Sequence, residues 1–232
     1  MTDLGTLGRS YAGAKGINNL GDVVGYASTP GNESMHAFWY RDGAMQDLGT
    51  LGGVHSFAMD INENGQVVGT SQTASEGDRA FVYENGAMTA LGVLDGLHSA
   101  GVDINEAGEV VGYADNEDGF WRAFLYRNGQ MFDLGTLGGT TSWAASINGS
   151  GQIVGTAKTL RDEEHGFLFS NDVMVDLNEL IDPLSGWTIV SANGINDRGQ
   201  IAATGFMSGV GSRALLLDPI VANAVPEPAM LG

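Results

Sequence analysis

The chain has 232 residues and is strongly acidic, with 28 Asp and Glu against 10 Lys and Arg and a formal net charge of −18 at pH 7. Such a surface repels phosphate backbones and anionic headgroups, so neither a nucleic-acid partner nor electrostatic docking on a membrane is expected. The absence of cysteine excludes disulfides, thiol nucleophiles and thiolate metal sites, and no apolar run approaches the ~20 residues of a membrane span.

The chain opens on the phrase DLGTLG at 3–8, which alternates apolar and polar residues as a half-buried strand does. Further on, FAMDI and QVVGTS are separated by NENG, and RAFVY and AMTAL by ENG. Asn and Gly at such bends favour tight hairpin turns. One unit therefore has four strands, which we name a, b, c and d. In the second unit they are expected at 58–61, 66–71, 80–83 and 88–91.

The unit recurs with a regular period. Its marker is the asparagine of the turn between strands a and b, which we expect to hold that turn through its side chain. The five copies, Asn18, Asn62, Asn105, Asn148 and Asn196, are 44, 43, 43 and 48 residues apart. A calcium site at these turns is the alternative, but the dense run of acidic ligands is missing. No segment has a helical period beyond one turn expected at 177–181.

Four-stranded units of ~40–45 residues are typical of β-propeller blades. The fold class predicted is all-β, a five-bladed β-propeller of four antiparallel strands per blade over 1–218, followed by a flexible tail over 219–232. The last unit lacks strand d, and the chain begins with an orphan one at 3–8. We expect this N-terminal strand to complete the last blade and close the ring. An open β-solenoid, the alternative, would need capping ends.

Strand c begins with a cationic or protonatable residue in every unit, and an acidic residue lies 11 positions later in most. We expect cross-strand ion pairs worth roughly 0.2–1 kcal/mol each. The expected pairs are His36 with Asp47, Arg122 with Asp133, His165 with Asp176 and Arg213 with Asp3. The alternative is a ring of cations that grips an anionic ligand.

In a propeller the b–c and d–a loops emerge on one face, and there the units differ most. Aromatic and imidazole side chains at a wet, acidic mouth suit sugar rings by stacking, with Asp and Asn accepting hydroxyl protons. The candidate ligand-binding residues are Tyr11, His55, Phe57, His98, Trp143 and Trp187. A metal bound by His55 and His98 lacks a third marked ligand, so no metal or other cofactor is predicted.

No catalytic residue is predicted. The acidic clusters at 115–118 and 162–164 supply the carboxylates that a glycoside hydrolase needs. Solvated loop charges are the simpler interpretation, because a chain with 28 acidic residues contains such clusters in any case.

The phrases DLGTLGG, SFAMDINENGQVVG and HAFWYRDGAMQDLGTLGG resemble the HAF repeat of bacterial extracellular proteins, named for the letters at 36–38. The closing unit, with DLNELIDPLSGW at 176–187, is similar to the usual final repeat of that family. The resemblance spans nearly the whole folded region. It implies an exported protein and no particular biochemical activity.

The last residues carry a second resemblance. VPEPAMLG at 225–232 resembles the start of a PEP-CTERM sorting signal, whose motif here is Val225, Pro226, Glu227 and Pro228. That resemblance implies processing of a precursor by an exosortase and a place at the cell surface or in the biofilm matrix of a Gram-negative bacterium. The membrane helix and basic cluster of such signals do not follow here.

The predicted function is a secreted or surface-associated, non-enzymatic binding or scaffold module that recognises extracellular polysaccharide at the b–c and d–a loop face. A glycoside-hydrolase-like enzyme that uses loop carboxylates is one alternative. A purely structural surface protein without a small ligand is the other.

Overall fold

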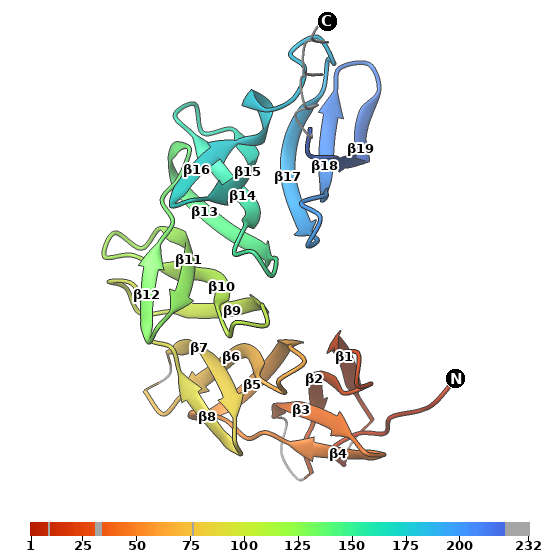
Figure 1. Ribbon diagram of the computed structural model, residues 1–232. Helices are drawn as coiled ribbons and strands as arrows, with labels where there is room; N and C mark the ends of the chain where they lie inside the picture. The colour runs from red at the N-terminus through yellow and green to blue at the C-terminus, as the bar shows by residue number, and fades with distance from the viewer. Residues whose placement is uncertain (9, 31–33, 76, 221–232) are drawn as a thin grey trace, which may run out of the picture.

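The structure is a computed structural model that describes residues 1–8, 10–30, 34–75 and 77–220. In these ranges nineteen strands form five sheets, each built from consecutive strands. Figure 1 shows the sheets following one another along an arc, from the red N-terminal sheet to the blue C-terminal one. The chain is thus all-β, as predicted, apart from the single 3-10 turn η1 (Leu177–Glu179), which falls where one helical turn is expected.

The first four sheets have four strands each, which correspond to strands a to d of the repeated unit. Their bounds are β1 (Ala12–Ile17), β2 (Val23–Ser28), β3 (Met35–Arg41) and β4 (Ala44–Asp47); β5 (Gly52–Ile61), β6 (Val67–Thr73), β7 (Asp78–Glu84) and β8 (Ala87–Ala90); β9 (Ser99–Ile104), β10 (Val110–Asp115), β11 (Trp121–Arg127) and β12 (Gln130–Asp133); β13 (Gly138–Ile147), β14 (Ile153–Thr159), β15 (Glu164–Ser170) and β16 (Val173–Asp176). The fifth sheet consists of β17 (Thr188–Ile195), β18 (Ile201–Met207) and β19 (Gly211–Leu217).

The turns follow from the residues at the bends. Between strands c and d, Asn85 and Gly86 have φ values of 51° and 82°. Both central residues of a type I′ turn need positive φ, and Asn-Gly adopts it at little cost. Between strands a and b, Gly65 has φ 74°. The hairpins predicted from these residues are therefore confirmed.

The strands share one register in all units. In the second sheet Ala58 pairs with Gly69, Gly69 with Phe81, and Phe81 with Ala90. A Cβ at Gly69 would overlap the carbonyl of Phe57, so this position of strand b requires glycine. The small residue of strand a, here Ala58, thus lies opposite the point where two backbones approach closely.

The core lies between neighbouring sheets. Phe38, Phe81, Phe124 and Phe167 recur at one position of strand c and are at most 1% exposed. Each apolar cluster combines two adjacent sheets, as where Leu125 of the third packs with Phe169 of the fourth. Burial of such side chains stabilises each junction by about 1.5–3 kcal/mol per residue.

The ends of the chain differ from the expectation. Residues 1–8 form no strand, and within the described residues β19 is the outer strand of a three-stranded sheet. Figure 1 shows the N-terminus beside the first sheet and away from β19. The expected strand at 3–8 is not formed here because its partner strand lies across the opening of the arc. Ring closure is therefore not shown by this structure.

Within the described residues, no helix has the length and apolar character that a bilayer crossing requires.

Candidate functional site

The turn asparagines do more than the predicted turn holding. The Asn62 side-chain oxygen accepts a hydrogen bond from Gln66 N at 3.0 Å, which fixes its own turn. Its Nδ2 donates to Asn105 O in the next sheet, also at 3.0 Å. The same link joins Asn18 to Asn62, Asn105 to Asn148 and Asn148 to Asn196 at 3.1–3.3 Å. These four bonds form what we call the asparagine ladder, and they identify these residues as structural.

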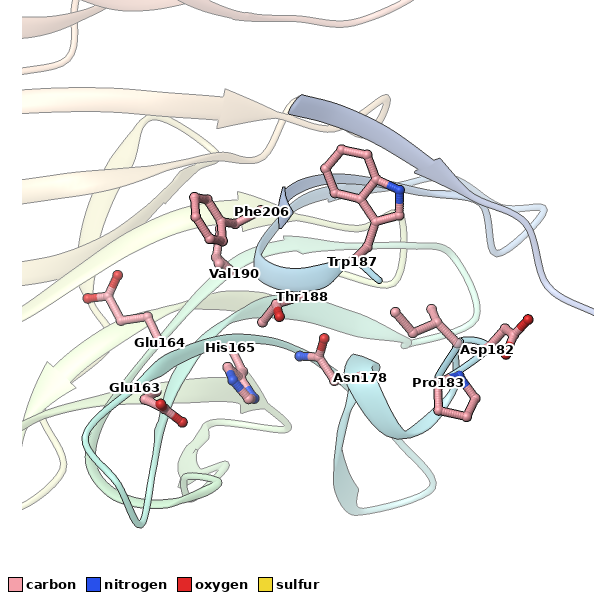
Figure 2. Close-up of a pocket in the computed structure, with 11 residues that line it drawn as sticks. Glu163, Glu164, His165, Asn178, Asp182, Pro183, Trp187, Thr188, Val190 and Phe206 are labelled. Atoms are coloured by element: carbon pink, nitrogen blue, oxygen red, sulfur yellow. The ribbon is translucent and has the colours of Figure 1, made fainter. Parts of the chain in front are cut away.

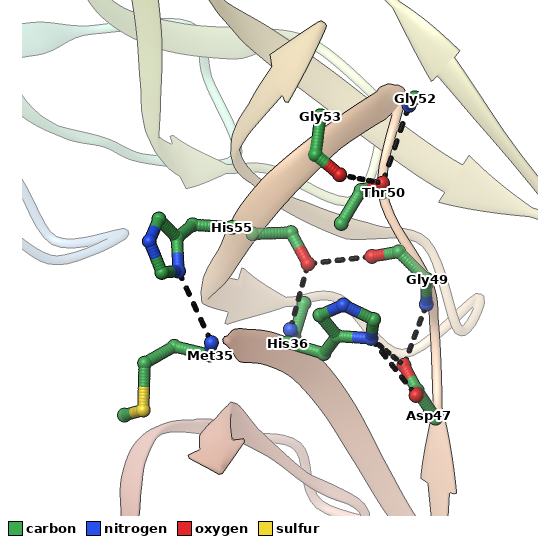
Figure 3. A network of polar contacts seen from close by, with 10 residues as sticks. Met35, His36, Asp47, Gly49, Thr50, Gly52, Gly53 and His55 are labelled. Atoms are coloured by element: carbon green, nitrogen blue, oxygen red, sulfur yellow. Dashed lines mark hydrogen bonds and ion pairs between the residues drawn. The ribbon is translucent and has the colours of Figure 1, made fainter. Parts of the chain in front are cut away.

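Two of the expected cross-strand pairs are in contact in the structure. His36 Nδ1 lies 2.9 Å from Asp47, and His165 Nδ1 lies 2.6 Å from Asp176. Asp47 also accepts a hydrogen bond from Gly49 N at 2.8 Å, so one carboxylate joins strand c to the linker between sheets (Figure 3).

The two arginine pairs are not formed among the described residues. Arg213 Nη1 donates to Ser212 O at 2.8 Å, and Asp3 accepts from Gly5 N instead. Arg122 Nε is buried without a hydrogen-bond partner, and Asp133 accepts from Gly135 N. Asp3 belongs to the N-terminal segment, which lies away from β19, the strand of Arg213 (Figure 1). Arg122 and Asp133 lie on the adjacent strands β11 and β12 and still form no pair. The predicted pairing holds only where strand c begins with histidine.

The two loop histidines serve the junctions between sheets. His55 Nδ1 accepts a hydrogen bond from Met35 N at 3.1 Å, as Figure 3 shows, and His98 Nδ1 accepts from Asp78 N at 3.3 Å. His55, near the start of β5, and His98, just before β9, thereby each connect strand a of one sheet to strand c of the sheet before it. In the part of the chain that the structure describes, no group of three His, Asp or Glu lies close enough to hold a metal ion.

The predicted aromatic residues do not form one continuous site. Tyr11 and Phe57 gather around Tyr26, with ring centroids 6.1 and 5.2 Å apart, and His55 stacks on Phe57 at 6.3 Å. A hydrogen bond with Tyr26 raises the pKa of Tyr11.

A second group contains His98, whose ring lies 6.5 Å from that of Trp121, and Tyr113 packs edge-on against Trp121 at 5.3 Å. Trp143 belongs to neither group and is half-buried on β13. Tyr26, Tyr113 and Trp121 are not among the residues predicted from the sequence, although they lie next to the predicted loops.

Trp187 lies in a separate pocket of about 790 Å³ between the fourth and fifth sheets. Figure 2 shows Glu163 and Glu164 at one end, Asp182 and Pro183 at the other, and Trp187 and Phe206 above. His165, Asn178 and Thr188 lie between the ends, where side chains from β15, η1 and β17 meet. Of the predicted ligand-binding residues, Trp187 lines this pocket.

The polar floor of the pocket is held rigidly. Asn178 accepts from Ile189 N at 2.7 Å and donates to Ile189 O at 3.1 Å and to Asp176 at 2.8 Å. Asp176 in turn holds His165. Two connected side chains, the amide and the imidazole, are therefore fixed by partners outside the pocket, as a binding site requires.

The chemistry of the lining is selective. Ionised carboxylates only accept hydrogen bonds, while Trp187 and Phe206 offer apolar ring faces. No Lys or Arg is among the residues that line the pocket. The arrangement therefore suits a neutral or cationic molecule that carries hydroxyl donors, and it repels anions.

The predicted sorting motif, Val225 to Pro228, lies outside the described residues.

Comparisons with known proteins give a partial match to one family. Residues 52–137 match a family described as "Protein of unknown function (DUF3466)", and this range covers the second and third sheets. No curated protein matches the chain.

Among solved structures, TolB from Acinetobacter baumannii is 17% identical with a TM-score of 0.50, and the match covers 69% of this chain and 41% of TolB. The chain thus spans less than half of that protein. The likeness supports a β-propeller-like arrangement of the sheets and nothing about activity.

Two further structures are more distant. A gluconolactonase from Xanthomonas campestris is 12% identical, with a TM-score of 0.46, over 86% of this chain and 69% of its own. The Aleuria aurantia lectin, solved with a methyl fucoside, is 12% identical, with a TM-score of 0.36, over 89% of this chain and 77% of its own.

Proposed function

We propose that the protein is a non-enzymatic binding module whose pocket between the fourth and fifth sheets takes a neutral or amino sugar of an extracellular polysaccharide. The observation that carries the proposal is the position of Trp187 and Phe206 above the fixed Asn178 and His165 (Figure 2). The apolar face of a sugar ring stacks on aromatic side chains, and its hydroxyls donate to carboxylates and amides. An acidic sugar is disfavoured because Glu163, Glu164 and Asp182 carry its own sign of charge.

The proposal includes export and a surface location. It is supported by the resemblance of the chain to HAF-repeat proteins and of 225–228 to a sorting motif. Fractionation of the native bacterium tests this part, since the protein is expected in the extracellular or surface fraction. Recovery from the cytoplasm alone would contradict it.

The proposal also takes the five sheets as blades of one propeller, in which the first and fifth come together. The common period and the arc of Figure 1 support this arrangement.

A glycan array with the purified protein, followed by titration of a bound sugar, tests the sugar site. We expect Trp187→Ala to raise the Kd about tenfold, since a strong aromatic stacking contact contributes about 1.4 kcal/mol. Trp143→Ala is the matched control, because Trp143 lies on β13 outside the pocket. Absence of binding by the wild-type protein at high micromolar sugar, or equal affinity of both variants, would remove the proposal.

A glycoside-hydrolase-like enzyme is the second candidate. The observation in its favour is the pairing of His165 with Asp176 beside Glu163 and Glu164. A histidine oriented by a carboxylate and a second carboxylic acid supply the base and the acid of hydrolysis. New reducing ends from a bound polysaccharide, lost in Glu163→Gln or Glu164→Gln, would establish this candidate. If the protein neither binds nor hydrolyses a polysaccharide, a purely structural role remains.

A further inference from the structure

The apolar contacts between neighbouring sheets have a repeated composition that changes at one junction. The first three clusters each include a methionine from strand d of the later sheet, namely Met88, Met131 and Met174. The cluster between the fourth and fifth sheets contains Ile195 and Leu217 but no methionine among the described residues. The reason is that β17–β19 has no strand d there.

A groove of about 530 Å³ lies where that methionine is missing. Its apolar lining includes Leu168, Ile195, Ile201 and Leu217. The residues at the same positions one junction earlier, Leu125, Ile147, Ile153 and Phe169, share a cluster with Met174. The groove therefore has the chemistry of a site for a strand d methionine.

The N-terminal residues supply the side chains that this junction lacks. Met1 precedes Asp3 by two positions, as Met45 precedes Asp47 in β4. Met1 is fully exposed in the structure, whereas the methionines of β8, β12 and β16 pack against the core. Leu4 follows Asp3 in the way that the buried Leu48 follows Asp47.

The backbone of this segment already has the conformation of a d–a linker. Gly5 N donates to Asp3 Oδ1 at 2.9 Å, and Gly8 N donates to Thr6 Oγ1 at 3.2 Å. The same two bonds occur at 47–52, at 2.8 and 3.2 Å, and at 133–138, at 2.7 and 3.2 Å. Little further ordering is needed for 3–8 to act as the linker that follows a strand d.

The asparagine ladder also has two complementary free ends. Asn196 Nδ2 bonds to Gln200 Oε1 within its own turn, and among the described residues it reaches no carbonyl of another sheet. Asn196 is exposed, while the four asparagines before it are at most 7% exposed. Asn18 O is the acceptor that a fifth ladder bond would use, since every earlier bond ends on such a carbonyl.

We propose that residues 1–8 are a strap that closes the arc by pairing with β19 as the missing strand d, with Met1 in the groove. Closure brings the first sheet against the fifth and places Asn196 beside Asn18. The movement is shared among four junctions, because each unit contacts only its neighbours. The strap is independent of the sugar site and is tested without a sugar.

The register of the closed sheet follows from the other units. Phe38 pairs with Asp47, and Leu215 takes the place of Phe38 because it pairs with Ala203 as Phe38 pairs with Gly25. Asp3 therefore lies opposite Leu215, and Thr2 opposite Leu216. Leu216 is 63% exposed in the open arrangement, and its N–H faces the free edge, because neighbouring residues of a strand alternate in bonding direction.

A cysteine pair tests the strap without interference, since the chain has no cysteine of its own. Thr2→Cys combined with Leu216→Cys should form an intramolecular disulfide on mild oxidation, because directly opposed residues of antiparallel strands lie within disulfide reach. Thr2→Cys combined with Ser212→Cys is the matched control, displaced by four residues on the same exposed edge. Non-reducing electrophoresis and mass spectrometry read the result.

The expected result is a disulfide-linked monomer for the first pair and free thiols for the second. Equal oxidation of both pairs, or free thiols in both, would overturn the proposal. Linked dimers at low protein concentration would also overturn it, because a second copy would then occupy the edge.

Hydrogen exchange tests the strap in the wild-type protein, without any substitution. The Leu216 amide should exchange as slowly as that of Trp39, which occupies the same place in β3 and is covered by β4. Fast exchange at Leu216 beside protection at Trp39 would show an uncovered edge and contradict the strap.

Discussion

At the scale of single residues, Asp60 has the most strongly raised pKa among the carboxyl groups that the structure describes. Burial, together with a hydrogen bond and the charge of the neighbouring Asp103, raises the pKa of Asp60 from 3.8 to about 8. Asp103 accepts a hydrogen bond from Ile147 N in the next sheet at 2.8 Å. Asp60 is therefore protonated at neutral pH and donates to its neighbour across the junction between the second and third sheets.

This acidity predicts a pH dependence of stability. The folded protein holds the Asp60 proton more tightly than the unfolded chain, so the free energy of unfolding falls as pH rises from about 4 to about 8. Asp60→Asn removes the ionisation, and its gain in stability over the wild type should be small at pH 5 and largest at pH 9. Urea denaturation at these two values measures it.

Asp42→Asn is the control, because the Asp42 side chain is 94% exposed. A stability difference between Asp60→Asn and the wild type that did not change with pH would show that Asp60 ionises freely.

A recurring serine in strand a was not predicted to have a role. Ser56, Ser99 and Ser142 recur six positions before the turn asparagine and are at most 1% exposed. Ser56 Oγ accepts from Ala37 N at 2.8 Å and donates to Gly49 O at 2.5 Å. Recurrence marked these serines, but a small polar residue in a strand does not show which neighbouring sheet it faces.

At the scale of the elements, the turns with the asparagines were predicted from the sequence, but their bonds to the next sheet were not. Asn and Gly at fixed spacing predict the turn itself, because local backbone geometry selects them. The bond from each turn to the next sheet depends on how neighbouring sheets stack, and the local sequence does not contain that relation.

The turn asparagines should therefore matter more than other residues of the same turns. Asn62→Ala should lower the free energy of unfolding by about 1–3 kcal/mol, since it leaves Gln66 N and a ladder carbonyl with fewer partners. Asn64→Ala, in the same turn, removes only an exposed hydrogen bond from Asn64 Nδ2 to Glu106 O at 3.0 Å and should change it by at most about 0.5 kcal/mol. Chemical denaturation compares the two, and equal losses would contradict a special role of the ladder.

At the scale of the whole molecule, net charge opposes compactness. A charge of −18 on 232 residues makes the folded chain repel itself. Salt shortens the Debye length from about 30 Å at 0.01 M to about 3 Å at 1 M.

Screening should therefore raise the Tm between 0.01 and about 0.5 M salt. Calorimetry in NaCl and in KCl checks this, and the two salts should act alike if ionic strength is the cause. An unchanged Tm would mean that local contacts already compensate the repulsion.

Most of the architecture was predictable from the repeat, because the residues of each unit determine the strands and turns of that unit. Ring closure is also predicted from the repeat, but it depends on the sum of four junction angles and on residues 1–8, whose partner lies far along the chain, and this structure does not show it. The candidate pocket was predictable only through Trp187. Its other walls come from β15, η1, β17 and β18, and the packing of the fourth sheet against the fifth brings them together.

The asparagine ladder has a consequence for how such a molecule arises. Every unit carries its own donor and its own acceptor, and successive units lie about 43 residues apart. A duplicated stretch of that length would contain both the asparagine donor and the carbonyl acceptor, and each would match the units on either side. The bonds between turns would thus be complete at once, whereas a ring closed by residues 1–8 would also need new angles at its junctions, so ring closure limits the number of units more strictly than the turns do.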